Sequence, residues 1–309
     1  MKSEFKLIEW IRLNAPAPRS GVGIGDDAAL ISFSGNKDVA VTTDAIVEDV
    51  DFLRRELPPR LAGRKALAVN LSDLAAMGAQ PESFVLTLGI PKDMKTRWVQ
   101  EFCLGVFSLA RRYGAACIGG DLSSSRRFFA SITLLGRVEK KKALLRSGAH
   151  PGDLLFVTGS LGGSILGHHA AFEPRIKEGL FLAQNIRPTA LMDVSDGLVQ
   201  DLGHLLKASR CGASLYLENI PVSKDAFKLA KGVKARALQH ALSDGEDFEL
   251  LFSIPGRQKA KLEQQWKKKF PSTSLSLIGR IEKGHAVCWL REGKPDRRFH
   301  VEKKGYQHF

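Results

Sequence analysis

Short segments that combine glycine or serine with one or two aspartates recur along this chain, and most of them follow or interrupt an apolar run. They are GIGDDAAL at 23–30, TTD at 42–44, NLSD at 70–73, GGD at 119–121, DVSDG at 193–197 and DGEDFE at 244–249. A carboxylate flanked by small residues at a strand end is uncrowded, and the backbone there can approach a ligand closely. Several such carboxylates in one cleft repel one another unless cations neutralise them, and oxygen ligands of this kind suit Mg²⁺, which usually binds with phosphates. The pattern therefore predicts a magnesium-dependent enzyme that acts on nucleotide phosphates.

The composition is that of a globular chain long enough for two domains. The sequence has 309 residues, of which 44% are hydrophobic and 26% are charged. No apolar run approaches the ~20 residues that cross a bilayer, so we expect no membrane partner. The four cysteines form no CxxC pair, which argues against a zinc site or a disulfide framework and favours a cytoplasmic location.

The formal net charge of +13 allows two interpretations. Most of the basic clusters are expected to be solvated surface, and together they create a field that attracts anionic substrates. Nucleic-acid binding is not predicted as the main function, because no basic cluster alternates with aromatic residues and no helix-turn-helix or zinc-finger pattern occurs.

Strand and helix patterns are intermixed along the chain, which predicts an α/β or α+β fold. Apolar runs between turn residues predict strands at 28–33, 39–42, 84–89, 116–119, 128–138, 154–158, 213–217, 248–254, 275–281 and 286–290, the one at 116–119 being short and buried. Helical spacing predicts helices at 1–14, 59–77, 94–113, 165–172 and 198–208, more helix within 224–242, and a polar linker at 173–179. A composition shift at 139–152 divides the chain into domains 1–142 and 143–309.

Asp73 is the strongest single candidate among the acids. It lies within the apolar helix predicted at 59–77, where an aspartate is costly unless it has a partner. That partner is either a metal ion or, in the alternative interpretation, an arginine. The segments GDD and TTD, taken singly, are as well explained by ordinary turns or helix caps.

The later motifs point to phosphate in the same way. The paired glycines of GGD allow the backbone to approach a phosphate closely before Asp121. In DVSDG, Asp193 and Asp196 flank Ser195, although capping of the next helix explains Asp196 equally well. Because the sequence contains no P-loop, no GxGxxG after a strand and no kinase-type HRD or DFG, a phosphoryl-transfer enzyme of this sequence needs another architecture.

These motifs, in this order, resemble those of the thiamine-monophosphate kinases. That family shares a superfamily with aminoimidazole ribonucleotide synthetase, selenophosphate synthetase and the hydrogenase-maturation protein HypE. The resemblance extends over essentially the whole chain, through GIGDDAALI at 23–31, NLSDLAAMGA at 70–79, DVSDGL at 193–198, SDGEDFELLF at 243–252 and KGYQHF at 304–309. The NLSDLAAMGA segment and the final KG–aromatic–HF pattern are specific to the kinases within the superfamily.

The resemblance implies a two-domain PurM-like architecture. Its N-terminal α/β domain has a mixed sheet that pairs across a homodimer, and an α+β C-terminal domain completes the site that holds ATP. The implied reaction transfers the γ-phosphoryl group of ATP to thiamine monophosphate in line, assisted by several Mg²⁺ ions, and gives thiamine diphosphate. Since the acceptor is already a phosphate oxygen, positioning and charge neutralisation can supply the catalysis without a strong base.

The resemblance also assigns site residues. Metal ligands are implied at Asp27, Thr42, Thr43, Asp44, Asp73, Asp121, Asp193 and Asp196. Nucleotide contacts are implied at Gly120, Asp121, Arg146, Ser195 and Tyr113, and substrate contacts at Asp51, Glu246 and Tyr306. Among these residues, we predict that catalysis depends most on Asp44, Asp73, Asp196 and Arg146.

Three positions depart from the family pattern. Asp49 and Asp244 replace glycines, and Asp51 replaces a histidine near the substrate. An acid at position 51 either attracts the thiazolium cation or repels the substrate phosphate. Two alternatives therefore stay open, namely another ATP-using enzyme of the superfamily and a weakly active thiamine-phosphate-binding protein.

Overall fold

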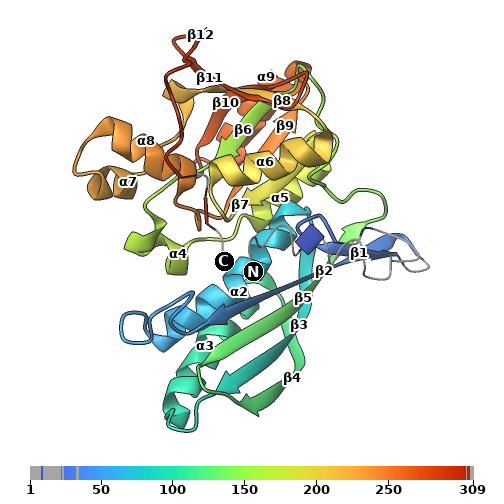
Figure 1. Ribbon diagram of the computed structural model, residues 1–309. Helices are drawn as coiled ribbons and strands as arrows, with labels where there is room; N and C mark the ends of the chain where they lie inside the picture. The colour runs from blue at the N-terminus through green and yellow to red at the C-terminus, as the bar shows by residue number, and fades with distance from the viewer. Residues whose placement is uncertain (1–7, 10–21, 23, 33–34, 304, 307–309) are drawn as a thin grey trace.

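The computed structural model describes residues 8–9, 22, 24–32, 35–303 and 305–306. Its framework is two mixed sheets, one formed by residues between 29 and 139 and the other by residues between 154 and 295 (Figure 1). The predicted α/β fold is therefore confirmed. Of the helix predicted at 1–14, Ile8 and Glu9 are described and helical, and the remainder lies outside the described residues, as do the last three residues of the KGYQHF motif.

The first sheet has the strand order β1-β2-β5-β3-β4. Its strands are β1 (Ala29–Ser32), β2 (Lys37–Val47), β3 (Gln80–Ile90), β4 (Ala116–Ser124) and β5 (Phe129–Glu139). The first two strands form an antiparallel pair, with Ala29 opposite Val41. β3 and β4 are parallel and the other pairs are antiparallel, so the sheet is mixed.

Helices α2 (Pro59–Ala76) and α3 (Thr96–Tyr113) cover one face of this sheet (Figure 1). The two helices cross closely at Gly63, which has no side chain. A Cβ atom there would lie 1.9 Å from the carbonyl oxygen of Phe102. α2 begins with a proline in its first turn, where the missing N–H costs nothing. It stops as predicted at Gly78, whose φ of +62° allows Ala79 N to donate to the Leu74 carbonyl at 2.8 Å.

The second sheet has the strand order β12-β11-β8-β10-β6-β9-β7. Its strands are β6 (Leu154–Thr158), β7 (Ala190–Val194), β8 (Gly212–Tyr216), β9 (Glu249–Ile254), β10 (Leu275–Glu282), β11 (Val287–Arg291) and β12 (Lys294–Pro295). The helices of this half are α4 (His168–Ala171), α5 (Ile176–Phe181), α6 (Leu198–Ser209), α7 (Lys224–Leu229), α8 (Lys234–Ser243) and α9 (Lys259–Lys269). Every residue of β7 and β9 is buried, so the continuous apolar pattern of these strands reflects cover on both faces.

Three predicted elements differ from the structure. The helix predicted at 165–172 is a 3₁₀ turn (Ser164–Leu166) followed by the four-residue α4, because Gly167 between them has a φ of +128°. The linker predicted at 173–179 contains the start of α5. The strand predicted to be short and buried at 116–119 is the longer β4, which is exposed throughout because it is an edge strand of its sheet in the single chain.

α2 is packed on both sides and joins the two halves of the molecule. One side faces the first sheet, and its C-terminal turn contacts α5 so closely that a Cβ atom at Gly179 would lie 2.1 Å from the Ala75 carbonyl oxygen. A single connected apolar core includes Leu71 of α2, Phe84 of the first sheet and Phe252 of the second. No helix within the described part of the chain is long and apolar enough to cross a membrane.

Candidate active site

Three aspartates from distant parts of the sequence meet beside α2. Asp27 precedes β1, Asp73 lies on α2 and Asp193 lies on β7. One carboxylate oxygen of each lies within 4.8 Å of the oxygens of the other two. A donor set made only of carboxylate oxygens suits a hard divalent cation such as Mg²⁺. We call these three residues the carboxylate cluster.

Neighbouring hydroxyl groups orient two members of the carboxylate cluster. Ser72 Oγ donates to Asp193 Oδ2 at 2.6 Å, and Thr42 Oγ1 donates to Asp73 Oδ2. Ser72 is adjacent to Asp73 on α2, so one helical turn supplies both a carboxylate and the hydroxyl that holds the next carboxylate. The partner of Asp73 in this structure is thus a threonine, and the arginine of the alternative interpretation pairs with another acid.

That acid is Asp27. Arg146 donates from Nε to Asp27 Oδ2 at 3.0 Å and from Nη2 to Asp27 Oδ1 at 2.8 Å, which is a two-pronged ion pair. The backbone N–H of Arg146 also donates to the carboxylate of Asp26 at 3.2 Å. The guanidinium neutralises one negative charge of the carboxylate cluster, and the described residues include no ion pair to Asp73 or Asp193.

The pKa values reflect this excess of acid. Burial, reinforced by the charge of Asp27, raises the pKa of Asp193 to about 8. Burial and Asp27 likewise raise the pKa of Asp26 to about 7. The pKa of Asp73 is well above its usual range, because the side chain is desolvated and Asp44, Asp193 and Asp27 are near. A bound divalent cation would favour the ionised forms and lower all of these pKa values.

β2 presents its TTD motif to both faces of the sheet. Thr42 is buried toward α2, whereas Thr43 points the other way and its Oγ1 lies 3.0 Å from Thr133 Oγ1, as expected for adjacent strand residues. Asp44 returns to the α2 side, and its backbone N–H donates to Asn70 Oδ1 at 3.1 Å. Burial raises the pKa of Asp44 as well. Thr42 and Asp44 therefore join the surroundings of the carboxylate cluster, and Thr43 lies on the opposite face.

The segment that links β7 to α6 brings together residues predicted for three different roles. Ser195 accepts the backbone N–H of Glu246 at 2.6 Å, and the carbonyl oxygen of Asp196 accepts that of Tyr306 at 3.0 Å. Gln200 Nε2 donates both to Asp196 Oδ2 at 3.0 Å and to the Tyr306 carbonyl at 2.6 Å. The side chain of Asp196 therefore contacts the side chain of Gln200 and does not cap α6, whose N-cap is Gly197 without a side-chain cap hydrogen bond. Its carbonyl oxygen also holds Tyr306.

Lys65 of α2 connects two of the predicted substrate residues. Its ammonium donates to the carbonyl oxygen of Asp51 at 3.0 Å and pairs with Glu246 Oε1 at 2.5 Å. The carboxylate of Asp51 accepts the backbone N–H of Val47 at 2.7 Å and so closes the turn after β2. The side chain of Glu246 is 38% exposed, so it faces solvent beyond the ion pair.

Three predicted residues lie apart from the carboxylate cluster within one chain. Gly120 and Asp121 are on the exposed edge strand β4, separated from β2 by β3 and β5, which is ~14 Å at ~4.8 Å per strand. Tyr113, at the end of α3, donates its hydroxyl to Glu173 and, at 3.2 Å, to the Pro174 carbonyl. Within the described part of the single chain, these three residues contact neither the carboxylate cluster nor Arg146.

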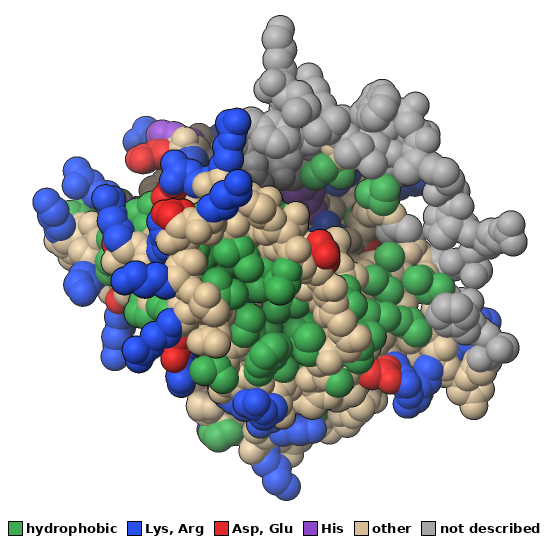
Figure 2. Space-filling view, turned by 90° about the horizontal axis from the view of Figure 1, so that it is seen from below, with side chains coloured by type: hydrophobic (Ala, Val, Ile, Leu, Met, Phe, Trp, Pro, Cys, Tyr) green, Lys and Arg blue, Asp and Glu red, His purple; other side chains and the backbone are tan. Residues whose placement is uncertain are grey.

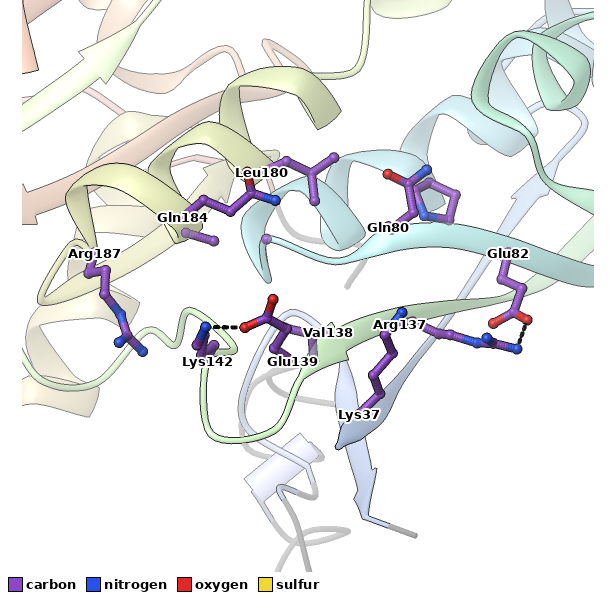
Figure 3. A pocket seen from close by; sticks show the side chains of 13 residues that line it. Lys37, Gln80, Glu82, Arg137, Val138, Glu139, Lys142, Leu180, Gln184 and Arg187 are labelled. Carbon is purple, nitrogen blue, oxygen red and sulfur yellow. Dashed lines mark hydrogen bonds and ion pairs between the residues drawn. The ribbon is translucent and has the colours of Figure 1, made fainter. Parts of the chain in front are cut away.

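A pocket of about 660 Å³ lies near the start of β2 and the end of β5, below α5 (Figure 3). Two ion pairs, Lys142 with Glu139 and Arg137 with Glu82, join residues that line this pocket. The pocket is not lined by any residue predicted for metal, nucleotide or substrate. We therefore assign the chemistry to the carboxylate cluster and not to this pocket.

The sequence motifs missed the residues that support these acids. Lys65, Asn70 and Ser72 on α2 hold residue 51, Asp44 and Asp193, and Asp26 accepts the backbone of Arg146. A partial signal was present for Asn70 and Ser72, because they stand beside Asp73 in the mostly apolar C-terminal part of α2. What the sequence does not contain is the identity of the partner that each of them contacts.

Comparison with known proteins agrees with the fold. The family described as AIR synthase related protein, N-terminal domain, matches residues 25–138. A thiamine-monophosphate kinase of Rhodopirellula baltica is 44% identical over 284 residues, covering 89% of this chain and 87% of its own length. The thiamine-monophosphate kinase of Escherichia coli K12 is 36% identical, with 99% of this chain and 98% of its own covered. The structure of AaThiL complexed with AMPPCP and TMP superimposes with a TM-score of 0.79 at 31% identity, covering 99% of this chain and 97% of that one.

These matches define the chain in two steps. Residues 25–138 match the N-terminal domain of the AIR synthase related proteins, which defines the class of the chain. Within that class, the chain belongs to the thiamine-monophosphate kinase family. The resemblance inferred from the motifs is thereby confirmed.

Proposed function

We propose that this protein transfers the γ-phosphoryl group of ATP to the phosphate of thiamine monophosphate. The observation that carries the proposal is the carboxylate cluster of Asp27, Asp73 and Asp193, whose oxygens converge within 4.8 Å. The relatives named as thiamine-monophosphate kinases, and the relative complexed with AMPPCP and TMP, supply the choice of donor and acceptor. The products are thiamine diphosphate and ADP.

The residues present fit Mg²⁺. Asp27, Asp73 and Asp193 would hold it, with Thr42 and Asp44 as further oxygen donors nearby. When bound, Mg²⁺ supplies charge neutralisation between two anionic reactants that otherwise repel each other. The raised pKa values of Asp73 and Asp193 support this assignment, since a site with too much buried acid is relieved by a cation.

The protein's own groups then orient the reactants. Arg146 offers a rigid guanidinium fork that matches phosphate oxygens, and Asp27 holds it in place. The attacking atom is already a phosphate oxygen, so an in-line approach and charge neutralisation suffice and no general base is required.

The acceptor side is assigned to Asp51, Glu246 and Tyr306. The half-exposed carboxylate of Glu246 is placed to attract the thiazolium cation, and the 40% exposed ring of Tyr306 can stack on it. The carboxylate of Asp51 accepts the backbone N–H of Val47 at 2.7 Å, which orients it within its own turn and leaves its negative charge in place.

The other two departures from the family pattern have local partners as well. Asp49 has a φ of +69°, the conformation that glycine favours, and pairs with Arg127 at 2.6 Å. Asp244 accepts the backbone N–H of Gly163 at 2.9 Å. The alternative of a weakly active binding protein rests on these substitutions, and each is explained by a contact outside the carboxylate cluster.

A second copy of the chain is part of the proposal. Seen from below, the molecule presents a broad apolar area on the face shown in Figure 2. On β4, Ile118 is 64% exposed and Leu122 is 71% exposed, and an edge strand of this kind is a ready surface for pairing. We infer that the first sheets of two subunits pack together, which would bring Gly120 and Asp121 of each to the nucleotide site of the other.

The proposed organisation keeps the division into domains 1–142 and 143–309, because one sheet ends at Glu139 and the next begins at Leu154. A cytoplasmic location is retained for the reason given by the cysteines. All four are free thiols in the structure, as expected in a reducing compartment.

The test is an ADP-release assay with Mg²⁺ and ATP. Thiamine monophosphate, thiamine or no acceptor is added in parallel, and thiamine diphosphate is identified by chromatography. ADP and thiamine diphosphate that form only with the monophosphate support the proposal. ATP turnover with a different acceptor would favour another enzyme of the superfamily, and binding of both ligands without turnover would favour the binding protein.

A further inference from the structure

Lys65 holds a charged group in the interior of the protein. Its side chain is among the largest that are fully buried, with 1% of the residue exposed. The ammonium donates to the Asp51 carbonyl at 3.0 Å and to Glu246 Oε1 at 2.5 Å. A buried ammonium is strongly unfavourable unless it is paired and hydrogen-bonded, so these two contacts account for the position of the charge.

The two contacts come from loops that are far apart in the sequence. Asp51 belongs to the turn after β2, which its own carboxylate closes by accepting the Val47 N–H at 2.7 Å. Glu246 belongs to the segment between α8 and β9, and its backbone N–H is fixed to the Ser195 carbonyl at 2.6 Å. One ammonium therefore fixes the distance between the two loops that form the proposed acceptor side.

The backbone at Glu246 shows that this loop is constrained. Its φ is +54°, a left-handed conformation that residues other than glycine adopt only when their surroundings enforce it. The hydrogen bond to Ser195 fixes the main chain, and the ion pair to Lys65 fixes the end of the side chain. Without Lys65 the carboxylate of Glu246 would be free to rotate into solvent.

Lys65 is separated from the metal side of the same helix. Asp73 follows it by eight residues, which is ~12 Å along an α-helix. The residues near that end, Ser72 and Asp73, contact Asp193 and Thr42. Loss of the Lys65 charge should thus disturb the acceptor side and leave the nucleotide and metal side in place.

We propose that Lys65 is a positioning residue for the phosphate acceptor, which acts by fixing the carboxylate of Glu246 and the turn at Asp51 relative to each other. This inference rests on the proposed function, since it assumes that Glu246 and residue 51 face the acceptor. It assigns to α2 a second role besides supplying Asp73.

The experiment compares Lys65→Met, which keeps the length of the side chain and removes the charge, with Lys92→Met, a control at an exposed lysine. Both variants and the unmodified protein are assayed for kcat and for the KM of each substrate. For Lys65→Met we expect the KM for thiamine monophosphate to rise by roughly tenfold or more, with the KM for ATP within about twofold. Lys92→Met should match the unmodified protein in every constant.

Glu246→Gln and the double variant test whether Lys65 acts through Glu246. Independent residues would multiply their effects on the KM, whereas a linked pair gives a double variant no worse than the poorer single one. Lys65→Arg keeps the charge and should restore at least part of the acceptor affinity. Lys65→Gln, which also removes the charge, replaces Lys65→Met in the comparison if the methionine variant does not fold.

The outcomes separate the two proposals. If the unmodified protein does not phosphorylate thiamine monophosphate, the proposed function itself fails. If the unmodified protein is active and Lys65→Met has an unchanged KM for thiamine monophosphate, or raises both KM values equally, the positioning role is overturned. Multiplicative effects in the double variant overturn it as well.

Discussion

The carboxylate cluster predicts that one substitution, Asp73→Asn, increases the stability of the metal-free protein and abolishes its activity. Replacing Asp73 by asparagine removes one negative charge and keeps a side-chain oxygen that can still accept the Thr42 hydroxyl. Without metal, this change should stabilise the protein, because Asp73 then no longer repels Asp27 and Asp193. With Mg²⁺ and substrates, the same change should abolish turnover, since the charge that holds the cation is gone.

The magnitude follows from the separation of the oxygens. Two unit charges at the 4.8 Å limit of the carboxylate cluster repel by about 3.5 kcal/mol at an effective dielectric constant of about 20. At neutral pH Asp193, with its pKa raised to about 8, is largely protonated, and burial raises the pKa of Asp73 in the same direction, which relieves part of this repulsion. We therefore expect Asp73→Asn to raise the free energy of unfolding by roughly 1 kcal/mol at pH 7 and by up to about 3 kcal/mol at pH 9.

The assay is urea unfolding of both proteins with EDTA and with Mg²⁺, at pH 7 and pH 9, combined with the ADP-release assay. In the unmodified protein Mg²⁺ should increase the free energy of unfolding, and in Asp73→Asn this increase should be largely lost. A folded Asp73→Asn that keeps its Mg²⁺-dependent turnover would refute the metal role of Asp73. A variant that is less stable than the original protein in EDTA would refute the account of repulsion within the carboxylate cluster.

Three further predictions use the same structure. Asp193, with its pKa raised to about 8, holds a proton in the folded but not the unfolded chain between about pH 4 and pH 8. Without metal, the free energy of unfolding should therefore fall as pH rises through that range, by up to about 1.4 kcal/mol per pH unit. Mg²⁺ should flatten this slope in urea titrations, and a slope of opposite sign would contradict the assignment. Arg146→Lys loses the bidentate contact with Asp27 and with phosphate, so kcat/KM for ATP should drop about 10- to 100-fold in steady-state kinetics. An unchanged kcat/KM would exclude Arg146 from the nucleotide site. Leu122→Glu on the exposed face of β4 should convert dimers to monomers in analytical ultracentrifugation and lower the activity. The control Leu104→Glu, at an exposed position on α3, should change neither the oligomeric state nor the activity. A Leu122→Glu dimer with full activity would contradict the proposed interface.

Local patterns in the sequence predicted most of the elements. α2 was predicted within one residue at its C-terminal end because Gly78, with its positive φ, is a strong stop signal next to an apolar helical repeat. β6 was predicted with its observed bounds, since a short apolar run stands between two turns. The α4 region was predicted less well, because Gly167 breaks a pattern that otherwise has helical spacing.

Exposure was harder to predict than element type. The apolar sequence at the start of β4 is typical of a buried strand, yet β4 is an exposed edge of the first sheet. An apolar run indicates that a strand is to be covered, and it does not say whether the cover is the same chain or another. The sequence therefore predicted an apolar strand at this position, and it did not predict that the strand is exposed in the single chain.

The sequence by itself indicated which acids are the candidates for the chemistry, because each stands in a short motif with small neighbours, and such a motif is a local property. Only the tertiary structure decided which of them meet. Asp27, Asp73 and Asp193 are brought together by the packing of α2 against both halves of the molecule, whereas Asp121, an equally plain motif, lies three strands away from β2. The partners of Lys65, Asn70 and Ser72 could not be predicted from the sequence either. A buried polar side chain needs a hydrogen-bonding partner, and residues distant in the chain meet only when the whole core is assembled.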